Sequence, residues 1–242
     1  MDEVKVIEIK KSIFEANEKD AKSLQEELKK KQVYLLNVMS SPGSGKTTTL
    51  IKIINDLKRK LNREKALVAC STGVDSMVLL HLAIKALPIT QIVVAHVNHQ
   101  KRLQSEIEEA YIKKFCDERG IKCYVMRLDH IDDGNFQSIA RNKRYKFFED
   151  IAKKENIKYI LLAHHANDNL ETIIMRLLKS SSLKGYGGIE KETIYHNNIL
   201  YRPLLELPKT KIKEYASLNN IEYYEDSSNS ELDYTRNRIR HL

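Results

Sequence analysis

The chain has 242 residues, 42% of them hydrophobic, which is enough for a sizeable core in one large or two small domains. Lysine and arginine outnumber aspartate and glutamate by 41 to 33, and the net charge of +8 is spread along the whole length, which suits a polyanionic partner without proving one. Three cysteines without a CxxC pair argue against a disulfide framework or structural zinc, and no apolar run approaches the length of a membrane span. We therefore expect a cytoplasmic protein without membrane association.

The first 40 residues predict a helical segment and one strand. Between residues 3 and 32, apolar side chains recur at helical spacing, which indicates a helix or a helix pair. Residues 33–39 are almost continuously apolar, as in a strand buried on both faces of a parallel sheet. A single strand cannot bury both faces by itself, so we expect it either to dock on the edge of a larger sheet or to pack poorly.

A partial P-loop pattern follows this strand. Gly45, Lys46 and Thr47 match the end of G-x-x-x-x-G-K-[ST], with Ser40 in place of the first glycine, and a helix is expected from Thr47 to Leu61. In such a loop the lysine reaches the terminal phosphates of a nucleotide and the threonine holds magnesium. The strand-end aspartate, water-positioning segment and base-reading motif of a GTPase are not recognisable further along the sequence.

The second part of the chain alternates strands with helices. A basic run at residues 58–65 precedes it, so we expect a partial P-loop segment at 1–60 and a catalytic domain at 61–242. The expected strands are 66–70, 91–97, 122–128 and 159–163, and the expected helices are 76–86, 104–119, 136–155 and 168–179. This alternation predicts an α/β fold with a Rossmann-like, doubly wound parallel sheet, in which ligands gather beyond the carboxyl ends of the strands.

The junction between the first strand and the first helix of this domain has the composition of a phosphate site. Small and hydroxylated residues let backbone N–H groups approach an anion, and the helix dipole points its positive end into the same space. The residues are Ser71, Thr72, Gly73, Val74, Asp75 and Ser76. An aspartate here needs a reason, because a carboxylate repels phosphate directly: Asp75 is a magnesium contact, a helix cap, or a group that orients a reactive phosphorus centre.

Polar side chains follow the other strands as well. His96 and His99 come at the end of the second strand and are expected to point the same way if the strand continues, with Lys101 and Arg102 adding positive charge. They lack a nearby carboxylate or cysteine for a metal site, so we favour nucleotide or substrate contacts over an ordinary surface loop. On the long helix, Arg141 and Arg144 share one face and can bind an anion together, although a solvated basic face has the same pattern.

The end of the fourth strand carries the densest polar cluster. Asp168 and Glu171 lie three residues apart at a helix start, so both carboxylates can face one spot suited to magnesium or to the ammonium of an amine substrate. A helix N-terminus with acidic first-turn residues looks similar. Residues 200–205 then form an apolar strand with one arginine, Arg202, and a polar loop and a basic helical turn follow near the end of the sequence.

These motifs, in order and spacing over residues 65–240, resemble the N-terminal catalytic domain of the tRNA(Ile)-lysidine synthetases, members of the PP-loop ATP pyrophosphatase superfamily. The matching pieces are Ser71-Thr-Gly-Val-Asp75-Ser76, His96-Val-Asn-His99, Ala140-Arg141-x-x-Arg144-Tyr145, His164-His165-x-x-Asp168-x-x-Glu171-Thr172, Arg202-Pro-Leu-Leu, Glu225-Asp226-x-x-Asn229 and Arg236-Asn237-x-x-Arg240. Two departures matter. Thr72 stands where glycine is usual, which adds a Cβ near the phosphates, and Asn167-Asp168-Asn169 stands where Asp-Asp-Gln is usual, which removes one candidate magnesium ligand.

The resemblance implies an adenine nucleotide alpha hydrolase-like fold and ATP-dependent conversion of the wobble cytidine of a tRNA(Ile) with a CAU anticodon to lysidine. The cytidine oxygen attacks the α-phosphate of ATP, pyrophosphate leaves, and the amine of L-lysine then displaces AMP. It further implies the site roles. The Ser71–Ser76 loop grips pyrophosphate, Asp75 and Asp168 hold Mg²⁺, Asp168 and Glu171 place the lysine ammonium, and Ala95 and His96 border the adenine. Arg202 acts at the reacting centre or on phosphate, and the expected substrate and tRNA contacts are His99, Arg102, Arg141, Arg144, His165, Asp226, Asn229, Arg236, Asn237 and Arg240.

Residues 1–58 resemble a different family, the start of the nickel-insertion GTPases of hydrogenase maturation. The matching pieces are Glu15-Ala-Asn-Glu, the run from Leu36 to Thr49, and Asn55-Asp-Leu-Lys. The metal-binding cysteines and the rest of that G domain are missing, so only the nucleotide loop is carried over. Two alternatives to a tRNA-modifying ligase therefore stay open: a P-loop GTPase or metallochaperone, and a catalytically idle nucleotide- or tRNA-binding fragment. Full-length synthetases carry further tRNA-binding domains, so we expect weak activity on tRNA unless such binding is supplied in trans.

Overall fold

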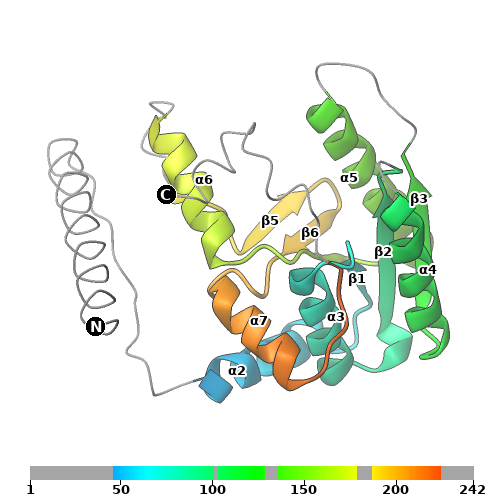
Figure 1. The fold of residues 1–242 in the computed structure, drawn as a ribbon, viewed down its shortest axis with the longest axis horizontal. Coiled ribbons are helices and arrows are strands. Elements are labelled where there is room, and N and C mark those ends of the chain that lie inside the picture. The colour runs from blue at the N-terminus through cyan, green and yellow to red at the C-terminus, as the bar shows by residue number, and fades with distance from the viewer. Residues whose placement is uncertain (1–45, 101–102, 129–135, 179–186, 225–242) are drawn as a thin grey trace, which may run out of the picture. The chain divides into compact units, whose positions relative to one another are not determined.

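The strands of the computed structural model form a single mixed sheet (Figure 1), and the structure describes residues 46–100, 103–128, 136–178 and 187–224. Within this part of the chain the sheet has six strands in the order β3-β2-β1-β4-β6-β5. The strands are β1 (Ala66–Ala69), β2 (Ile92–Asn98), β3 (Lys122–Arg127), β4 (Tyr159–Leu161), β5 (Glu192–Tyr195) and β6 (Asn198–Tyr201). The helices are α2 (Lys46–Leu61), α3 (Val74–Ala86), α4 (Leu103–Asp117), α5 (Phe136–Glu155), α6 (Ala166–Leu178) and α7 (Lys209–Leu218), with a 3₁₀ turn at Ile89–Gln91.

Five of the six strands are parallel, which confirms the doubly wound α/β sheet. β1 lies at the centre, where Leu67 is in register with Val93 of β2 and with Ile160 of β4. β3 and β6 extend the parallel pairing on either side, and only β5 runs antiparallel, beside β6. All parallel strands therefore end at one edge of the sheet, which is where ligands of such folds bind.

The two faces of the sheet are covered by different helices. α2, α3, α4 and α7 contribute to one apolar cluster with the side chains of Ala66 and Val68, whereas α5 contributes to a second cluster with Leu67. Successive residues of β1 thus point to opposite faces, and both faces are buried. This double burial explains why the strands read as continuous apolar runs rather than as alternating ones.

Helix α2 begins at the partial P-loop and packs against the sheet domain. Ile53, Leu57 and Leu61, each four residues apart, are buried in the cluster that contains α3. The boundary at residue 60 stays a prediction, and the structure adds that the helix before it belongs to the same compact unit, residues 45–242. The expected strand 33–39, the loop at Gly45 and the helical stretch 3–32 lie outside the described residues.

Two elements were not expected from the sequence. β5 is short and alternates between exposed and half-buried positions, so it lacks the apolar run that marks the buried strands. It forms a hairpin with β6 through His196, whose φ of +49° is a left-handed turn conformation. α7 begins after Pro208, its N-cap, and buries only Ile212, Tyr215 and Ala216. The expected strand 200–205 overlaps β6 only at Leu200 and Tyr201, because β6 begins at Asn198 and ends at Tyr201 and a turn follows.

Candidate active site

The loop from Ser71 to Ser76 joins β1 to α3 and wraps around one hydroxyl group. The Ser71 N–H donates to Ser76 Oγ at 3.1 Å, and this hydroxyl donates to the carbonyl oxygen of Gly73 at 2.9 Å. Gly73 is the N-cap of α3 and has no side chain with which to satisfy the first N–H groups of the helix. Thr72 is fully buried and has a φ of +64°, the left-handed conformation that favours glycine. The result is an open helix N-terminus beside a tight turn, which suits an anion.

Asp75 lies in the first turn of α3 between a lysine and a histidine. Its Oδ2 is 2.5 Å from Lys209 Nζ, and its Oδ1 is 3.7 Å from His165 Nε2. Oδ1 is buried and, among the described residues, accepts no hydrogen bond. A buried carboxylate oxygen in this state is costly unless a cation or a donor reaches it.

His165 and Asp168 cap helix α6 reciprocally. The His165 N–H donates to Asp168 Oδ2 at 3.0 Å, and the Asp168 N–H donates to His165 Nδ1 at 3.4 Å, which is the geometry of a capping box. The alternative given by the sequence for this cluster, a capped helix N-terminus with an acidic first turn, is therefore present in the structure. It leaves Asp168 Oδ2 at 3.5 Å from His165 Nε2, so both Asp75 and Asp168 have a carboxylate oxygen within 4 Å of the same ring nitrogen.

The His165 ring is held neutral by its surroundings. Burial lowers its pKa, with a smaller contribution from the Lys209 charge, and together these outweigh the carboxylates of Asp168, Asp75 and Glu171, which act to raise it. Because Nδ1 accepts the Asp168 N–H, the geometry assigns the proton to Nε2, which faces Asp75. Glu171 is itself buried one helical turn from the cap.

A cavity of about 420 Å³ opens beside these groups at the carboxyl ends of β1, β2 and β4. Its polar side is made by the loop and the two aspartates, and its apolar side by strand ends and by the α5 aromatic rings. Of the predicted site residues it is lined by Ser71, Asp75, Ser76, Ala95, His99, Arg144 and Asp168. Val97, Tyr145, Phe148 and Leu162 complete the apolar side. A flat apolar base and a phosphate chain could therefore occupy one continuous space.

The two histidines of the second strand have separate positions. His96 is buried, and its Nδ1 lies 2.9 Å from the carbonyl oxygen of Cys70, whereas His99 is exposed at the cavity rim. β2 ends at Asn98, and side chains three positions apart along a strand face opposite sides. The expectation that both histidines point the same way is therefore wrong.

The predicted arginines are distributed over three environments. Arg141 is exposed, with its Cζ 5.2 Å from the Tyr145 ring centroid, while the half-buried Arg144 lines the cavity and has its pKa lowered by burial. Arg202 is buried away from the cavity lining, and its Nη1 donates to the Glu190 carbonyl oxygen at 2.7 Å and to Thr193 Oγ1 at 2.9 Å. Arg102, Asp226, Asn229, Arg236, Asn237 and Arg240 lie outside the described residues.

Lys209 is the site residue that the sequence did not reveal. It opens α7, a helix that sequence patterns did not predict, and it reaches Asp75 from 134 positions further along the chain. A signal was nevertheless present, because Pro208 is typical of a helix start and the apolar Ile212, Tyr215 and Ala216 follow at helical spacing.

Comparison with protein-family models gives one decisive match. The model of the PP-loop domain, an ATP-binding family, matches residues 46–242. The chain belongs to the PP-loop domain family. The matched range begins where helix α2 begins and includes the loop, both aspartates and Lys209.

Curated relatives of this PP-loop chain include tRNA(Ile)-lysidine synthases. The enzyme of Staphylococcus epidermidis is 42% identical over 179 residues, which are 72% of this chain and 41% of that protein. The enzyme of Streptococcus equi is 40% identical over 195 residues, 78% of this chain and 43% of that protein. The chain thus spans less than half the length of these relatives.

Solved structures share the PP-loop fold at low sequence identity. The U34-tRNA thiolase NcsA of Methanococcus maripaludis has a TM-score of 0.58 and 19% identity, covering 74% of this chain and 66% of that chain. The NH3-dependent NAD synthetase of Campylobacter jejuni has a TM-score of 0.52 and 14% identity, covering 73% and 74%. These neighbours confirm the adenine nucleotide alpha hydrolase-like fold.

The two asparagines that depart from the usual Asp-Asp-Gln pattern have defined contacts. Asn167 Oδ1 accepts the Lys209 N–H at 3.0 Å, and Asn169 Oδ1 accepts the Ile189 N–H at 2.6 Å. Position 167 therefore faces the start of α7 and does not line the cavity. Asparagine in place of aspartate at position 167 therefore does not remove a metal ligand from this cavity.

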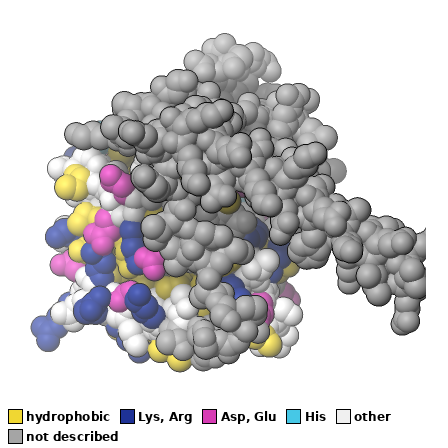
Figure 2. All heavy atoms as spheres, turned by 90° about the vertical axis from the view of Figure 1, so that its left-hand side faces the viewer, with side chains coloured by type: hydrophobic (Ala, Val, Ile, Leu, Met, Phe, Trp, Pro, Cys, Tyr) yellow, Lys and Arg dark blue, Asp and Glu magenta, His cyan; other side chains and the backbone are white. Residues whose placement is uncertain are grey.

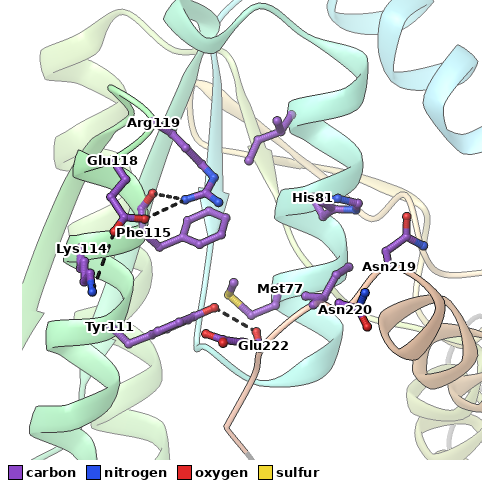
Figure 3. Close-up of a pocket in the computed structure, with 12 residues that line it drawn as sticks. Met77, His81, Tyr111, Lys114, Phe115, Glu118, Arg119, Asn219, Asn220 and Glu222 are labelled. Carbon is purple, nitrogen blue, oxygen red and sulfur yellow. Dashed lines mark hydrogen bonds and ion pairs between the residues drawn. The ribbon is translucent and has the colours of Figure 1, made fainter.

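A second cavity, of about 530 Å³, lies between α3, α4 and residues 219–222 (Figure 3). Met77 and His81 of α3 face Tyr111 and Phe115 of α4 across it, and the Tyr111 hydroxyl donates to the Glu222 carbonyl oxygen at 3.1 Å. Among the described residues that were predicted for the site, none lines this cavity. The cavity beside the Ser71–Ser76 loop is therefore the candidate active site, although it is the smaller of these two cavities.

Proposed function

We propose that this PP-loop chain carries the catalytic domain of an ATP-dependent ligase that converts the wobble cytidine of tRNA(Ile) to lysidine with L-lysine. One observation supports this proposal above the others. The Ser71–Ser76 loop, Asp75 and Asp168 surround one cavity at the strand ends, in a chain about 40% identical to proteins named tRNA(Ile)-lysidine synthase. In this proposal the three free cysteines fit a reducing cytoplasm.

The cavity suits ATP with the adenine between apolar walls. Ala95, Val97 and Phe148 offer flat apolar contact, and the N–H groups at the start of α3 offer donors to the phosphates. His96 supports the loop from behind through Cys70 and borders the adenine only indirectly. In this arrangement the β- and γ-phosphates lie in the loop and leave together as pyrophosphate.

Asp75 and Asp168 fit a magnesium ion that also binds phosphate. Within the described residues no group of three or more metal-binding side chains is present, and proteins commonly hold Mg²⁺ through one or two carboxylates plus substrate phosphates. The buried Asp75 Oδ1 accepts no hydrogen bond among the described residues and is the first candidate ligand. When bound, the ion would neutralise charge on the α-phosphate and the departing pyrophosphate.

The chemistry proceeds in two balanced steps. The cytidine oxygen forms a bond to the α-phosphorus while the bond to pyrophosphate breaks, which leaves an adenylated base. The amine of lysine then forms a carbon–nitrogen bond as the carbon–oxygen bond to AMP breaks, and the amine loses a proton. In this proposal Asp168 and Glu171 hold the lysine ammonium before attack, and the neutral His165 is close enough to Asp75 to orient that carboxylate.

Contacts to tRNA are proposed at the cavity rim. On the face shown in Figure 2, the described Lys and Arg side chains are interspersed with Asp and Glu and do not form one basic patch. Arg144 and His99 line the cavity and the exposed Arg141 contacts the ring of Tyr145, which also lines it, so these three are the proposed contacts to tRNA phosphate. The candidates outside the described residues keep their proposed phosphate or adenylate contacts, whereas the buried Arg202 contacts Glu190 and Thr193 and is not proposed to contact phosphate. Separate nucleotide binding by Gly45, Lys46 and Thr47 remains a prediction of the partial P-loop.

The test uses labelled lysine, ATP and an isoleucine tRNA with a CAU anticodon. We expect lysine incorporation with one pyrophosphate released per lysidine, and a loss of more than about 100-fold in D75N, because the carboxylate that would hold the divalent ion at the reacting phosphates is removed. The matched control is D150N, at an exposed aspartate of α5 that pairs with Lys146 at 3.6 Å. If D75N released pyrophosphate as fast as D150N, the mechanism would be wrong, and GTP turnover without lysine incorporation would favour a GTPase.

A further inference from the structure

Lys209 is fixed at its backbone and reaches the site only with its side chain. Its N–H donates to Asn167 Oδ1 at 3.0 Å, and the neighbouring Ala166 N–H of α6 donates to the Leu207 carbonyl oxygen at 3.0 Å. The starts of α6 and α7 are therefore tied together at two points. From this anchor four rotatable bonds lead to an ammonium group on Asp75, so the ammonium can change partners while α7 stays in place.

The ammonium stands where positive charge is already abundant. The N-termini of α3, α6 and α7 are brought together by the contacts of Asp75, Asn167 and Lys209, and each carries a partial positive charge. Asp75 offsets that charge, and Lys209 in turn neutralises Asp75. Without a nucleotide, the Lys209 ammonium therefore neutralises Asp75, the same carboxylate that is proposed to bind a metal ion.

We propose that Lys209 is a positioning residue whose ammonium, on Oδ2 of Asp75 in the nucleotide-free protein, neutralises that carboxylate and opposes by charge repulsion the binding of a divalent ion at the neighbouring Oδ1. If a divalent ion bound at Asp75 together with nucleotide phosphates, the Lys209 ammonium could leave the carboxylate and contact a phosphate instead. The free protein consequently binds a divalent ion poorly. This inference rests on the proposed metal contact of Asp75 and is independent of which nucleic acid or amine the enzyme uses.

The prediction is a rise in metal affinity when the ammonium is removed. Mn²⁺, followed by electron paramagnetic resonance without nucleotide, should bind about five- to tenfold more tightly to K209M than to the wild type, as expected for loss of a partly buried charge partner. K209R should keep wild-type affinity because it keeps the charge. K211M is the matched control, since Lys211 lies on the same helix and pairs with the exposed Glu214 at 2.7 Å.

The double variant K209M/D75N separates this inference from its premise. It should lose the gain in Mn²⁺ affinity, because the gain arises at Asp75. Unchanged Mn²⁺ affinity in K209M, with unfolding temperature close to that of K211M, would overturn the role of Lys209. If K209M does not fold, tighter Mn²⁺ binding by K209Q than by K209R supports the inference and equal binding refutes it. Should D75N bind Mn²⁺ with ATP as tightly as the wild type, the premise itself fails.

Discussion

The Nδ1 atom of His96 lies 2.9 Å from the carbonyl oxygen of Cys70, so a buried histidine of β2 supports the residue from which the phosphate loop departs. Burial lowers the pKa of His96, which keeps the ring neutral near pH 7. The neutral ring donates from Nδ1 to this carbonyl, an assignment that follows from the acceptor it faces. The histidine of the neighbouring strand thus helps to set the geometry of the nucleotide loop.

Replacing His96 should therefore affect both stability and nucleotide binding. We expect H96A to lower the free energy of unfolding by about 2 kcal/mol through the lost hydrogen bond and the cavity it leaves. ATP affinity should fall as well, because the start of the loop loses its support. H99A is the comparison: His99 is exposed, so its unfolding free energy should stay within about 0.5 kcal/mol of wild type. Equal urea midpoints for the two variants would contradict this assignment.

Thr72 tests the cost of a β-branched residue in a left-handed conformation. In T72G, relief of about 1–2 kcal/mol of backbone strain should offset the lost burial and the added freedom of glycine, leaving the free energy of unfolding within about 1 kcal/mol of wild type. T72V keeps the strain and the volume but loses the bond from Thr72 Oγ1 to the Ser71 carbonyl oxygen, 2.5 Å, and should be less stable by about 1–2 kcal/mol. Equally destabilised variants in urea titration would exclude strain at this position.

Two buried glutamates should make the protein sensitive to acid. Hydrogen bonds from Arg127, Lys113 and Asn98 lower the pKa of Glu109 from 4.5 to about 2, and those from Tyr124, Lys122 and Lys65 lower the pKa of Glu155 to about 2. Since the folded-state pKa values are depressed, this stabilisation is complete above about pH 4.5 and is lost as the pH falls toward 2.

The acid dependence can be measured by thermal unfolding from pH 7 to pH 2.5. E109Q and E155Q should each be less stable by about 2 kcal/mol at pH 7 and should converge with the wild type at the acid end. E118Q, at an exposed glutamate of the α4 end, should follow the wild-type curve. A wild-type curve that stays flat below pH 4.5 would contradict the role of both carboxylates.

Gly188 should tolerate no side chain. Its φ is +68°, and a Cβ there would clash with Asn169 Oδ1 and lie 3.0 Å from Ile173 Cγ1. We expect G188A to cost about 3 kcal/mol, because left-handed strain is added to the loss of the Asn169 bond to Ile189. G120A has the same backbone strain without a clash and should cost about 1 kcal/mol, and G187A should be nearly neutral. The ranking of the three unfolding free energies is the measurement.

The helices and strands that could be predicted from the sequence are those with a clear pattern of apolar residues. The limits of α5 match those expected, and β1 to β4 lie within one or two residues of prediction. Burial on both faces gives β1, β2 and β4 clear apolar runs, whereas β3, at the edge of the sheet, is only half-buried. β5 escaped prediction because an edge strand needs no such run. The loop, Asp75 and Asp168 were found because backbone geometry and chemistry demand specific residue types at fixed spacing.

Contacts between residues that are far apart in the sequence could not be predicted in the same way. Lys209 meets Asp75 only because α7 returns to the carboxyl edge of the sheet, and a lysine at a helix start carries no mark of its distant partner. The opposite positions of His96 and His99, by contrast, follow from their three-residue spacing, because side chains alternate between the two faces of a strand. Arg202 looked like a phosphate ligand, but its described contacts tie β6 to β5.

The carbonyl oxygen of Thr72 accepts the N–H of Tyr224 at 3.0 Å, so the phosphate loop is joined to the stretch of chain that leads away from α7. The Tyr111 hydroxyl holds the same stretch through Glu222. A force applied to the chain beyond residue 224, such as that of a bound macromolecule, would therefore reach the left-handed residue of the loop through this hydrogen bond, and α4 through Tyr111. Binding of a macromolecule to that part of the chain could thus change the conformation of the phosphate loop and, with it, the binding of a nucleotide.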